Sequence, residues 1–314
     1  MLAAAQRAGY ELVSQCKVGT CSTCAATLVD GAAEMPSGQI SVLTKDEVAA
    51  GQRLLCQSRA LCDSSFEMDY PSTLLEANPP VLFQARIARL TWVADTVVEV
   101  ELKVPKSMKF GFTAGQYCRI KVPGTEQWRS YSMASGEHER FRLTFLIRIL
   151  PSGLMSDYLR DRARVGETLE VEGPLGGFVL EPAPRPTILM AGGTGLAPML
   201  SMLDRLRTVV PAPPVLLVFG CNREAELFHE EELAARASFM PTLQVRTVLM
   251  DNTGREDLPS GTPLAVLSSK DVAPDAVAYL CGPPPMIRAA QETLGGYGLA
   301  AHDIRAEQFL PSDN

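Results

Sequence analysis

The chain has 314 residues, of which 46% are hydrophobic and 21% charged, and its net charge is −7 at pH 7. This length allows two or three domains with their own cores, and the composition is that of a soluble globular protein. The acidic balance argues against a nucleic-acid partner, because a basic stripe that could neutralise phosphates is missing.

Four of the eight cysteines are grouped near the start of the chain. Cys16, Cys21 and Cys24 have the spacing C-x4-C-x2-C, and Cys56 follows at a distance. Plant-type [2Fe–2S] clusters use this spacing, with three thiolates on a short loop and a fourth supplied from elsewhere. The alternatives are a zinc site, which prefers two C-x2-C pairs, and a set of buried free thiols. We predict a [2Fe–2S] cluster, and the scattering of the other cysteines favours a reducing cytoplasm over disulfides.

Residues 1–74 are predicted to form the cluster domain, with a strand over 25–29 and a capping box at Thr44 and Glu47. The remaining single cysteines at 62, 118 and 221 are expected in the core. The domain resembles plant-type ferredoxins, whose β-grasp fold normally starts with a β-hairpin that is missing here; the resemblance implies that residues 2–9 form the helix that follows this hairpin. We therefore expect a β-grasp-like domain without its first hairpin, and a linker over residues 71–80.

Residues 75–183 are predicted to form a small antiparallel β-barrel, because six strand-like runs alternate with turns over 86–90, 97–104, 116–122, 130–134, 142–149 and 168–172. Bound FAD needs a cation, an aromatic face and a hydrogen-bonding group, which Arg129, Tyr131 and Ser132 can supply. The turn Gly153, Leu154, Met155 and Ser156 opens a helix whose amides can hold a phosphate. Ile147 is a further predicted cofactor contact. An ordinary strand could also carry Arg-Ser-Tyr-Ser.

Residues 184–314 are predicted to form an α/β domain with a parallel sheet, because strands over 187–190, 214–219, 244–249 and 276–280 alternate with helices. The uncharged run 186–203 has nearly the length of a membrane span, but its glycines and proline would break such a helix. A strand, a tight turn and a helix are predicted instead. The small residues of that turn suit a dinucleotide pyrophosphate: Gly192, Gly193, Thr194, Gly195, Ala197 and Pro198.

Arg223 follows the second strand of this domain, where a 2′-phosphate of NADPH would need a cation. Glu224 and Glu226 flank it and would repel that phosphate. The sequence therefore favours NADH.

The order of these motifs resembles the ferredoxin–NADP⁺ reductase superfamily, and local stretches around residues 122–132, 153–159 and 191–198 resemble the reductase components of benzoate and anthranilate dioxygenases. The resemblance implies that Ser132, beside Tyr131, lies near flavin N5, where hydride arrives. It places Cys281, Gly282, Pro283 and Met286 beside the nicotinamide and Phe309 beside the flavin. Cys281 could instead be a packed small residue, and Phe309 part of a solvated tail.

The resemblance implies an NADH-dependent oxidoreductase that passes electrons from NADH to FAD, to the [2Fe–2S] cluster and to the Rieske centre of a separate terminal oxygenase. We expect a monomer with no membrane partner. The alternatives are a reductase for a di-iron monooxygenase, a redox carrier or sensor that does not turn over, and an NADH–flavin reductase whose truncated ferredoxin domain does not fold.

Overall fold

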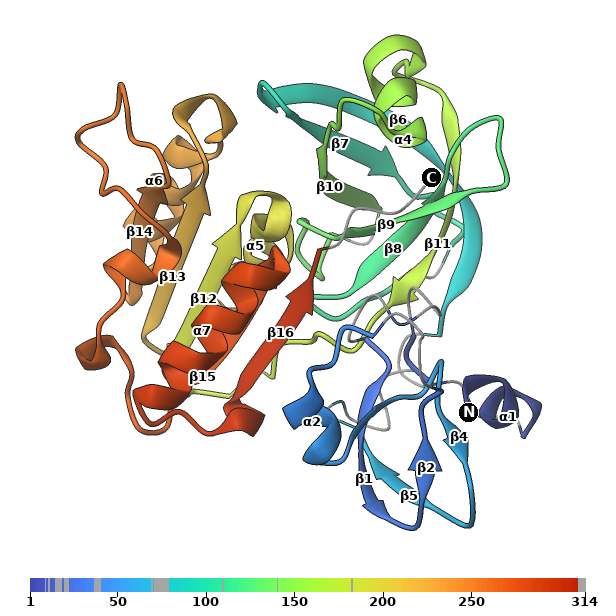
Figure 1. The fold of residues 1–314 in the computed structure, drawn as a ribbon. Coiled ribbons are helices and arrows are strands. Elements are labelled where there is room, and N and C mark those ends of the chain that lie inside the picture. Colours follow the sequence, from blue (N-terminus) through green and yellow to red (C-terminus); the bar gives the residue numbers. More distant parts are fainter. Residues whose placement is uncertain are drawn as a thin grey trace.

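The computed structural model describes residues 1–8, 10, 12–14, 19, 23–36, 41–68, 70, 79–108, 110–139, 141–181 and 183–309. Three lobes follow one another along the chain: the first holds two small sheets, and the second and third are each built on one larger sheet (Figure 1). Cys16, Cys21 and most of the predicted linker lie outside the described residues. Within them, no helix is long and apolar enough to cross a membrane.

The first lobe is a small β structure. Its central strand β1 (Ala25–Asp30) pairs antiparallel with β3 (Gln52–Leu54) and β5 (Ser65–Glu67), and β2 (Ala33–Glu34) pairs with β4 (Arg59–Ala60). The helices are α1 (Leu2–Arg7) and α2 (Lys45–Ala49). The predicted capping box at the start of α2 is confirmed, because Thr44 and Glu47 each bond the other's backbone N–H.

One prediction about this lobe is wrong. Cys62 is exposed, whereas Cys118 and Cys221 are buried as expected. Cys62 lies in the bend between β4 and β5, next to Leu61, which is also exposed, and its Sγ lies 4.0 Å from the Ser64 hydroxyl. A two-residue strand followed directly by a bend leaves no inner face for this side chain.

The second lobe is the predicted antiparallel barrel. Its strands are β6 (Val81–Ala94), β7 (Val97–Lys103), β8 (Tyr117–Lys121), β9 (Trp128–Ser132), β10 (Arg142–Arg148) and β11 (Thr168–Leu175). They pair in the order β10-β7-β6-β11-β8-β9, and a bridge between Met133 and Phe145 closes β9 onto β10. Alternate residues such as Phe83, Ala85 and Ile87 of β6 fill the interior. The helical turns α4 (Leu154–Asp157) and η1 (Tyr158–Arg162) connect β10 to β11.

The third lobe is a five-stranded parallel sheet. Its strands are β12 (Thr187–Gly192), β13 (Val215–Cys221), β14 (Leu243–Leu249), β15 (Val277–Gly282) and β16 (Ile304–Gln308), in the order β14-β13-β12-β15-β16. The sequence did not predict β16. Helices α5 (Leu196–Leu206) and α6 (Glu230–Phe239) pack on one face and α7 (Pro284–Gly296) on the other. Short 3-10 turns complete the lobe: η2 (Gly193–Gly195), η3 (Glu224–Glu226), η4 (Pro263–Val266), η5 (Ser269–Asp271) and η6 (Ala301–Asp303).

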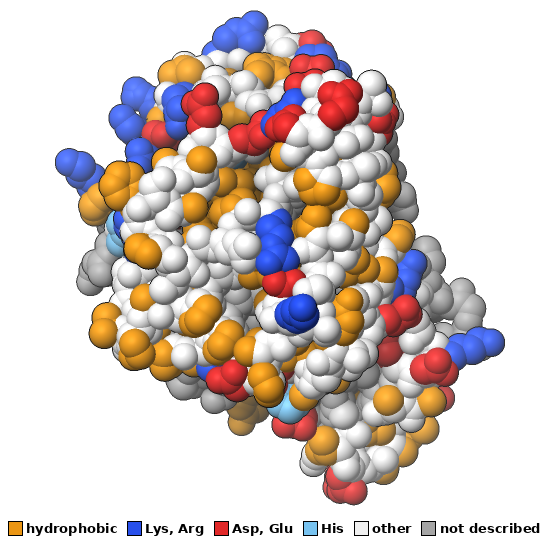
Figure 2. All heavy atoms as spheres, turned by 90° about the vertical axis from the view of Figure 1, so that its left-hand side faces the viewer, with side chains coloured by type: hydrophobic (Ala, Val, Ile, Leu, Met, Phe, Trp, Pro, Cys, Tyr) orange, Lys and Arg blue, Asp and Glu red, His pale blue; other side chains and the backbone are white. Residues whose placement is uncertain are grey.

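The side of the molecule seen in Figure 2 carries Lys and Arg interspersed with Asp and Glu. Among the described residues on this face, no continuous basic stripe is visible.

A largely buried histidine, whose side chain is 11% exposed, joins the barrel to the parallel-sheet lobe. His229 has a left-handed backbone (φ 59°), and its Nδ1 lies 3.0 Å from Glu232 Oε2 while its Nε2 lies 3.3 Å from Glu99 Oε2 on β7. Burial lowers the pKa of His229, but the two carboxylates outweigh it and raise the value to about 9. The imidazolium is therefore the form held between the two lobes at neutral pH.

Candidate functional site

The carboxyl end of β16 meets the end of β9 between the barrel and the parallel sheet (Figure 1). Here the Ser132 hydroxyl donates a hydrogen bond to Glu307 Oε2 at 2.9 Å, and both residues are buried. Burial raises the pKa of Glu307 to about 7, although the bond from Ser132 lowers it. A carboxyl group with this pKa can gain or lose a proton near neutral pH.

Cys281 lies beside the same carboxyl group, because the register of β15 and β16 pairs it with Glu307. Burial and then the charge of Glu307 raise the pKa of the Cys281 thiol well above its ordinary value, so the thiol stays protonated. The structure thus brings Ser132 and Cys281 to one carboxyl group. The sequence did not predict Glu307 as the partner of Ser132 and Cys281. The feature that could have indicated it is an acidic residue two positions before Phe309.

The residues of strand β9 that precede the buried Ser132 are partly exposed. Arg129, Ser130 and Tyr131 are all partly exposed. The Arg129 guanidinium is held by the Trp128 carbonyl at 3.0 Å and by Gln127 Oε1 at 2.7 Å, and Tyr131 packs against the barrel core. Burial raises the pKa of Tyr131, which keeps the phenol neutral. A cation and a neutral aromatic face on one strand fit the pyrophosphate and the ring system of FAD.

The predicted phosphate turn lies at the start of α4. Gly153 precedes the helix, and no side chain caps its first turn, so backbone N–H groups are left for a phosphate. Ser156 is buried, and its hydroxyl oxygen accepts a hydrogen bond from the Leu150 N–H at 3.0 Å. A phosphate contact for Ser156 stays a prediction, as do the contacts expected for its neighbours Leu154 and Met155 and for the buried Ile147.

The two glycine-containing turns of the third lobe pack against each other. A Cβ on Gly195 would lie 2.2 Å from the Cys281 carbonyl oxygen, and one on Gly192 would lie 2.8 Å from Met286 Sδ. Gly193, in contrast, has φ +55°, and a Cβ there would meet no atom within 4 Å. Packing therefore requires glycine at positions 192 and 195. Gly193 instead leaves room where a pyrophosphate can approach the backbone.

The other predicted dinucleotide contacts surround these turns. Thr194 lies in η2, while Ala197 and Pro198 are buried in the first turn of α5, and Gly282 and Pro283 lead into α7. Phe309 is partly buried against the core of the parallel sheet, and its N–H donates to the Gly282 carbonyl at 3.0 Å. This packing argues against the alternative of a solvated tail.

Arg223 is exposed at the carboxyl end of β13 and lies 3.4 Å from Glu226. Glu226 also lies 3.5 Å from Arg148 of the barrel and accepts a hydrogen bond from Asn222 at 3.0 Å. A carboxylate held here opposes a 2′-phosphate, which agrees with the predicted preference for NADH.

Two of the four predicted cluster ligands can be located. Cys24 immediately precedes β1 and Cys56 follows β3, and the Leu55 N–H donates to the Cys24 carbonyl at 3.0 Å. Both cysteines pack in the core of the first lobe. Among the described residues no three His, Cys, Asp or Glu side chains form a metal site; Cys16 and Cys21 lie outside those residues. The pairing of β1 with β3 brings the distant Cys56 to the same end of the sheet as Cys24, which is compatible with a plant-type cluster.

Three families match successive parts of the chain. Residues 1–61 match the 2Fe-2S iron-sulfur cluster binding domain, 84–180 the oxidoreductase FAD-binding domain and 189–292 the oxidoreductase NAD-binding domain. These matches confirm the predicted cofactors: a [2Fe–2S] cluster, FAD and a nicotinamide dinucleotide.

The chain is 34% identical to the anthranilate 1,2-dioxygenase electron transfer component of Acinetobacter baylyi, over 100% of this chain and 92% of that protein. It is 33% identical to methane monooxygenase component C of Methylosinus trichosporium, over 82% of this chain and 77% of that protein. A crystal structure of an Amycolatopsis cytochrome P450 reductase superposes with a TM-score of 0.76 at 28% identity, over 99% of this chain and 94% of that one. The chain therefore belongs to the family of oxidoreductases, built from 2Fe-2S, FAD-binding and NAD-binding domains, that includes the electron transfer components of 1,2-dioxygenases.

Proposed function

We propose that this protein is the NADH-dependent reductase of an aromatic-ring-hydroxylating dioxygenase of the benzoate or anthranilate type. Its electrons pass from NADH to FAD, to the [2Fe–2S] cluster and then to the Rieske centre of the terminal oxygenase. The contact between Ser132 and Glu307 carries the proposal, because it joins the predicted flavin strand to the nicotinamide lobe at a titratable group. The aromatic substrate is handled by the oxygenase.

The chain's own residues bind and orient the reactants. When bound, FAD converts the hydride chemistry of NADH into single-electron transfers. Arg129 would neutralise pyrophosphate charge, and Tyr131 would offer the ring a neutral face. Ser132 donates to Glu307, which can hold or release a proton near neutral pH where β9 would hold the ring. The protonated Cys281 places a small uncharged side chain next to that carboxyl group.

The test is an anaerobic visible and EPR spectrum of the purified protein before and after addition of NADH. Bleaching of the flavin together with a rhombic [2Fe–2S] signal is expected. Bleaching without a cluster signal would show that the protein is only an NADH–flavin reductase. Sustained NADH-dependent reduction of cytochrome c would exclude a carrier or sensor that does not turn over.

A reductase for a di-iron monooxygenase is the second candidate, favoured by the similarity to methane monooxygenase component C. The two functions differ in the acceptor. The reduced protein is mixed with an anthranilate-type Rieske oxygenase or with a di-iron hydroxylase, and hydroxylated product is measured. Product from the Rieske oxygenase alone is expected.

Three further properties belong to the proposal. The carboxylates near Arg223 support NADH, to be tested by the ratio of kcat/KM for NADH and NADPH. We propose a monomer in the cytoplasm, with domains over residues 1–74, 75–183 and 184–314. Light scattering of the holoenzyme tests the monomer.

A further inference from the structure

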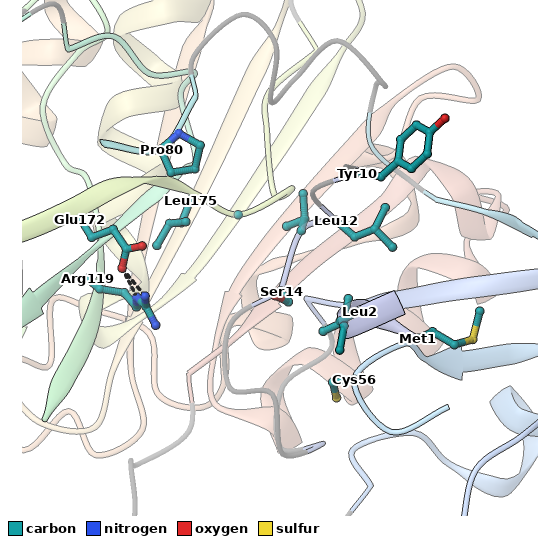
Figure 3. Close-up of a pocket in the computed structure, with 13 residues that line it drawn as sticks. Met1, Leu2, Tyr10, Leu12, Ser14, Cys56, Pro80, Arg119, Glu172 and Leu175 are labelled. Atoms are coloured by element: carbon teal, nitrogen blue, oxygen red, sulfur yellow. Dashed lines mark hydrogen bonds and ion pairs between the residues drawn. The ribbon is translucent and has the colours of Figure 1, made fainter. Parts of the chain in front are cut away.

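The segment directly before the cluster loop is attached to the barrel at a small apolar contact. Val13 is 4% exposed and packs against Val179, which is 2% exposed, and against Tyr70. Beside this contact lies a cavity of about 410 Å³. Figure 3 shows Leu12 and Ser14 on one side of it and the Arg119–Glu172 ion pair of the barrel on the other. The position of this segment therefore depends on a few specific contacts.

Two tyrosine hydroxyls bond the backbone of this segment: Tyr117 belongs to the barrel, and Tyr70 follows the first lobe with its ring against Gly177 of the barrel region. Tyr117 of β8, which is 1% exposed, donates to the Ser14 carbonyl at 3.3 Å. The Tyr70 hydroxyl accepts from the Val13 N–H at 3.1 Å. The amide of one residue and the carbonyl of the next are thus each satisfied by a tyrosine.

A pair of glycines makes room for both rings. A Cβ on Gly176, whose φ is +95°, would lie 2.8 Å from the Tyr117 ring, and a Cβ on Gly177 would lie 3.0 Å from the Tyr70 ring. Because neither Gly176 nor Gly177 has a side chain, each tyrosine ring can pack directly against the backbone of one of them. The rings are therefore fixed in place by close packing as well as by their hydroxyl bonds.

Tyr117 connects this attachment to the flavin strand. In the register of β8 and β9, Tyr117 pairs with Ser132, and Ser14 precedes Cys16 by two residues in the sequence. We propose that Tyr117 and Tyr70 are positioning residues that clamp the segment before the cluster loop onto the flavin barrel and so determine the rate of electron transfer from flavin to cluster. This inference rests on the proposed function.

The test compares the wild-type holoenzyme with Tyr117→Phe, Tyr70→Phe and the double variant, because phenylalanine keeps the ring and removes only the hydroxyl. Tyr158→Phe is the matched control, since its hydroxyl donates to Glu167 within the barrel at 2.7 Å, away from the clamp. Anaerobic stopped-flow absorption follows flavin reduction by NADH and then cluster reduction. Cluster content, EPR g-values and the cluster midpoint potential are measured for each variant.

We expect each single variant to slow cluster reduction about fivefold, the factor that corresponds to one net hydrogen bond, and the double variant to slow it more. Flavin reduction, cluster content, g-values and potential should stay at wild-type values, which a general loss of structure would not allow. Cluster reduction at the wild-type rate in the double variant, or equal slowing in Tyr158→Phe, would overturn the clamp. Failure of NADH to reduce the cluster in the wild type would instead overturn the proposed function.

Discussion

The hydroxyl of Ser132 and the carboxyl group of Glu307, 175 residues apart in the sequence, form a buried hydrogen bond of 2.9 Å. It joins the last residue of β9 in the barrel to the carboxyl end of β16 in the parallel sheet. Because this bond lies where the flavin and nicotinamide lobes meet, its two partners are the first residues to test.

Ser132→Ala removes the hydroxyl that we place beside the flavin. We expect the rate of flavin reduction by NADH to fall about 100-fold, the lower end of the range for a positioned proton-transfer group. The KM for NADH should change little, because the dinucleotide turn is untouched. Stopped-flow absorption under anaerobic conditions measures the rate, and an unchanged rate would remove Ser132 from the reaction.

Glu307→Gln should make the protein more stable at alkaline pH. The ordinary pKa of the carboxyl is 4.5 and its folded value is about 7, so the folded state holds the proton more tightly than the unfolded state. Wild-type stability therefore falls as pH rises from 4.5 to 7, and the loss reaches about 3 kcal/mol above pH 7. Glutamine has no such loss.

Urea unfolding of wild type and Glu307→Gln at a series of pH values measures this difference. The two proteins should have equal free energies of unfolding near pH 4.5 and differ increasingly toward pH 8. A difference that does not depend on pH would contradict the raised pKa.

His229→Gln should weaken the joint between the barrel and the parallel sheet at acidic and neutral pH. The ordinary pKa of 6.5 is raised to about 9, so the charged form stabilises the fold fully below pH 6.5, and this contribution is lost as pH rises through 9. We expect the free energy of unfolding of His229→Gln to be lower than that of wild type by at most about 3 kcal/mol, because His229 and Glu99 form an ion pair without an aligned hydrogen bond. Thermal unfolding of His229→Gln and of His302→Gln, whose side chain is 84% exposed, tests this; only the first should lose stability.

Cys56→Ser should abolish the rhombic EPR signal while leaving flavin reduction by NADH intact. A serine hydroxyl is a poor substitute for a thiolate on iron. Reduction of cytochrome c should fall with the cluster. Cys62→Ser is the matched control, because Cys62 is exposed in the same lobe, and it should keep the full signal. A normal signal in Cys56→Ser would exclude Cys56 as a ligand.

Gly195→Ala should disrupt the packing of the two dinucleotide turns, because its Cβ would meet the Cys281 carbonyl at 2.2 Å. We expect a loss of about 1–3 kcal/mol in stability, typical of an overpacked site, and a higher KM for NADH. Gly296→Ala at the end of α7 meets no atom within 4 Å and is the control. It should be neutral or stabilising by up to about 1 kcal/mol. Equal behaviour of the two variants would contradict the packing requirement.

Much of the architecture could be predicted because its signals are local. Alternating hydrophobic residues identified all six barrel strands, and glycine turns after apolar runs identified the first strands of the parallel sheet. Strand β16 was not predicted, because Ile304–Gln308 mixes charged and apolar residues and is held by pairing with β15. The prediction that Cys62 is buried was wrong for a related reason. The burial of a side chain depends on its neighbours in space, which an isolated cysteine in the sequence does not indicate.

The sequence by itself determined the cluster spacing, the flavin strand, the dinucleotide turn and their order, since each depends on residues close together in the chain. Only the tertiary structure decided that Glu307 meets Ser132, that His229 bridges two lobes and that Tyr117 reaches Ser14. These contacts join residues that are far apart in the sequence. Their distances and pKa shifts arise from the docking of whole lobes, which buries charged and polar groups together.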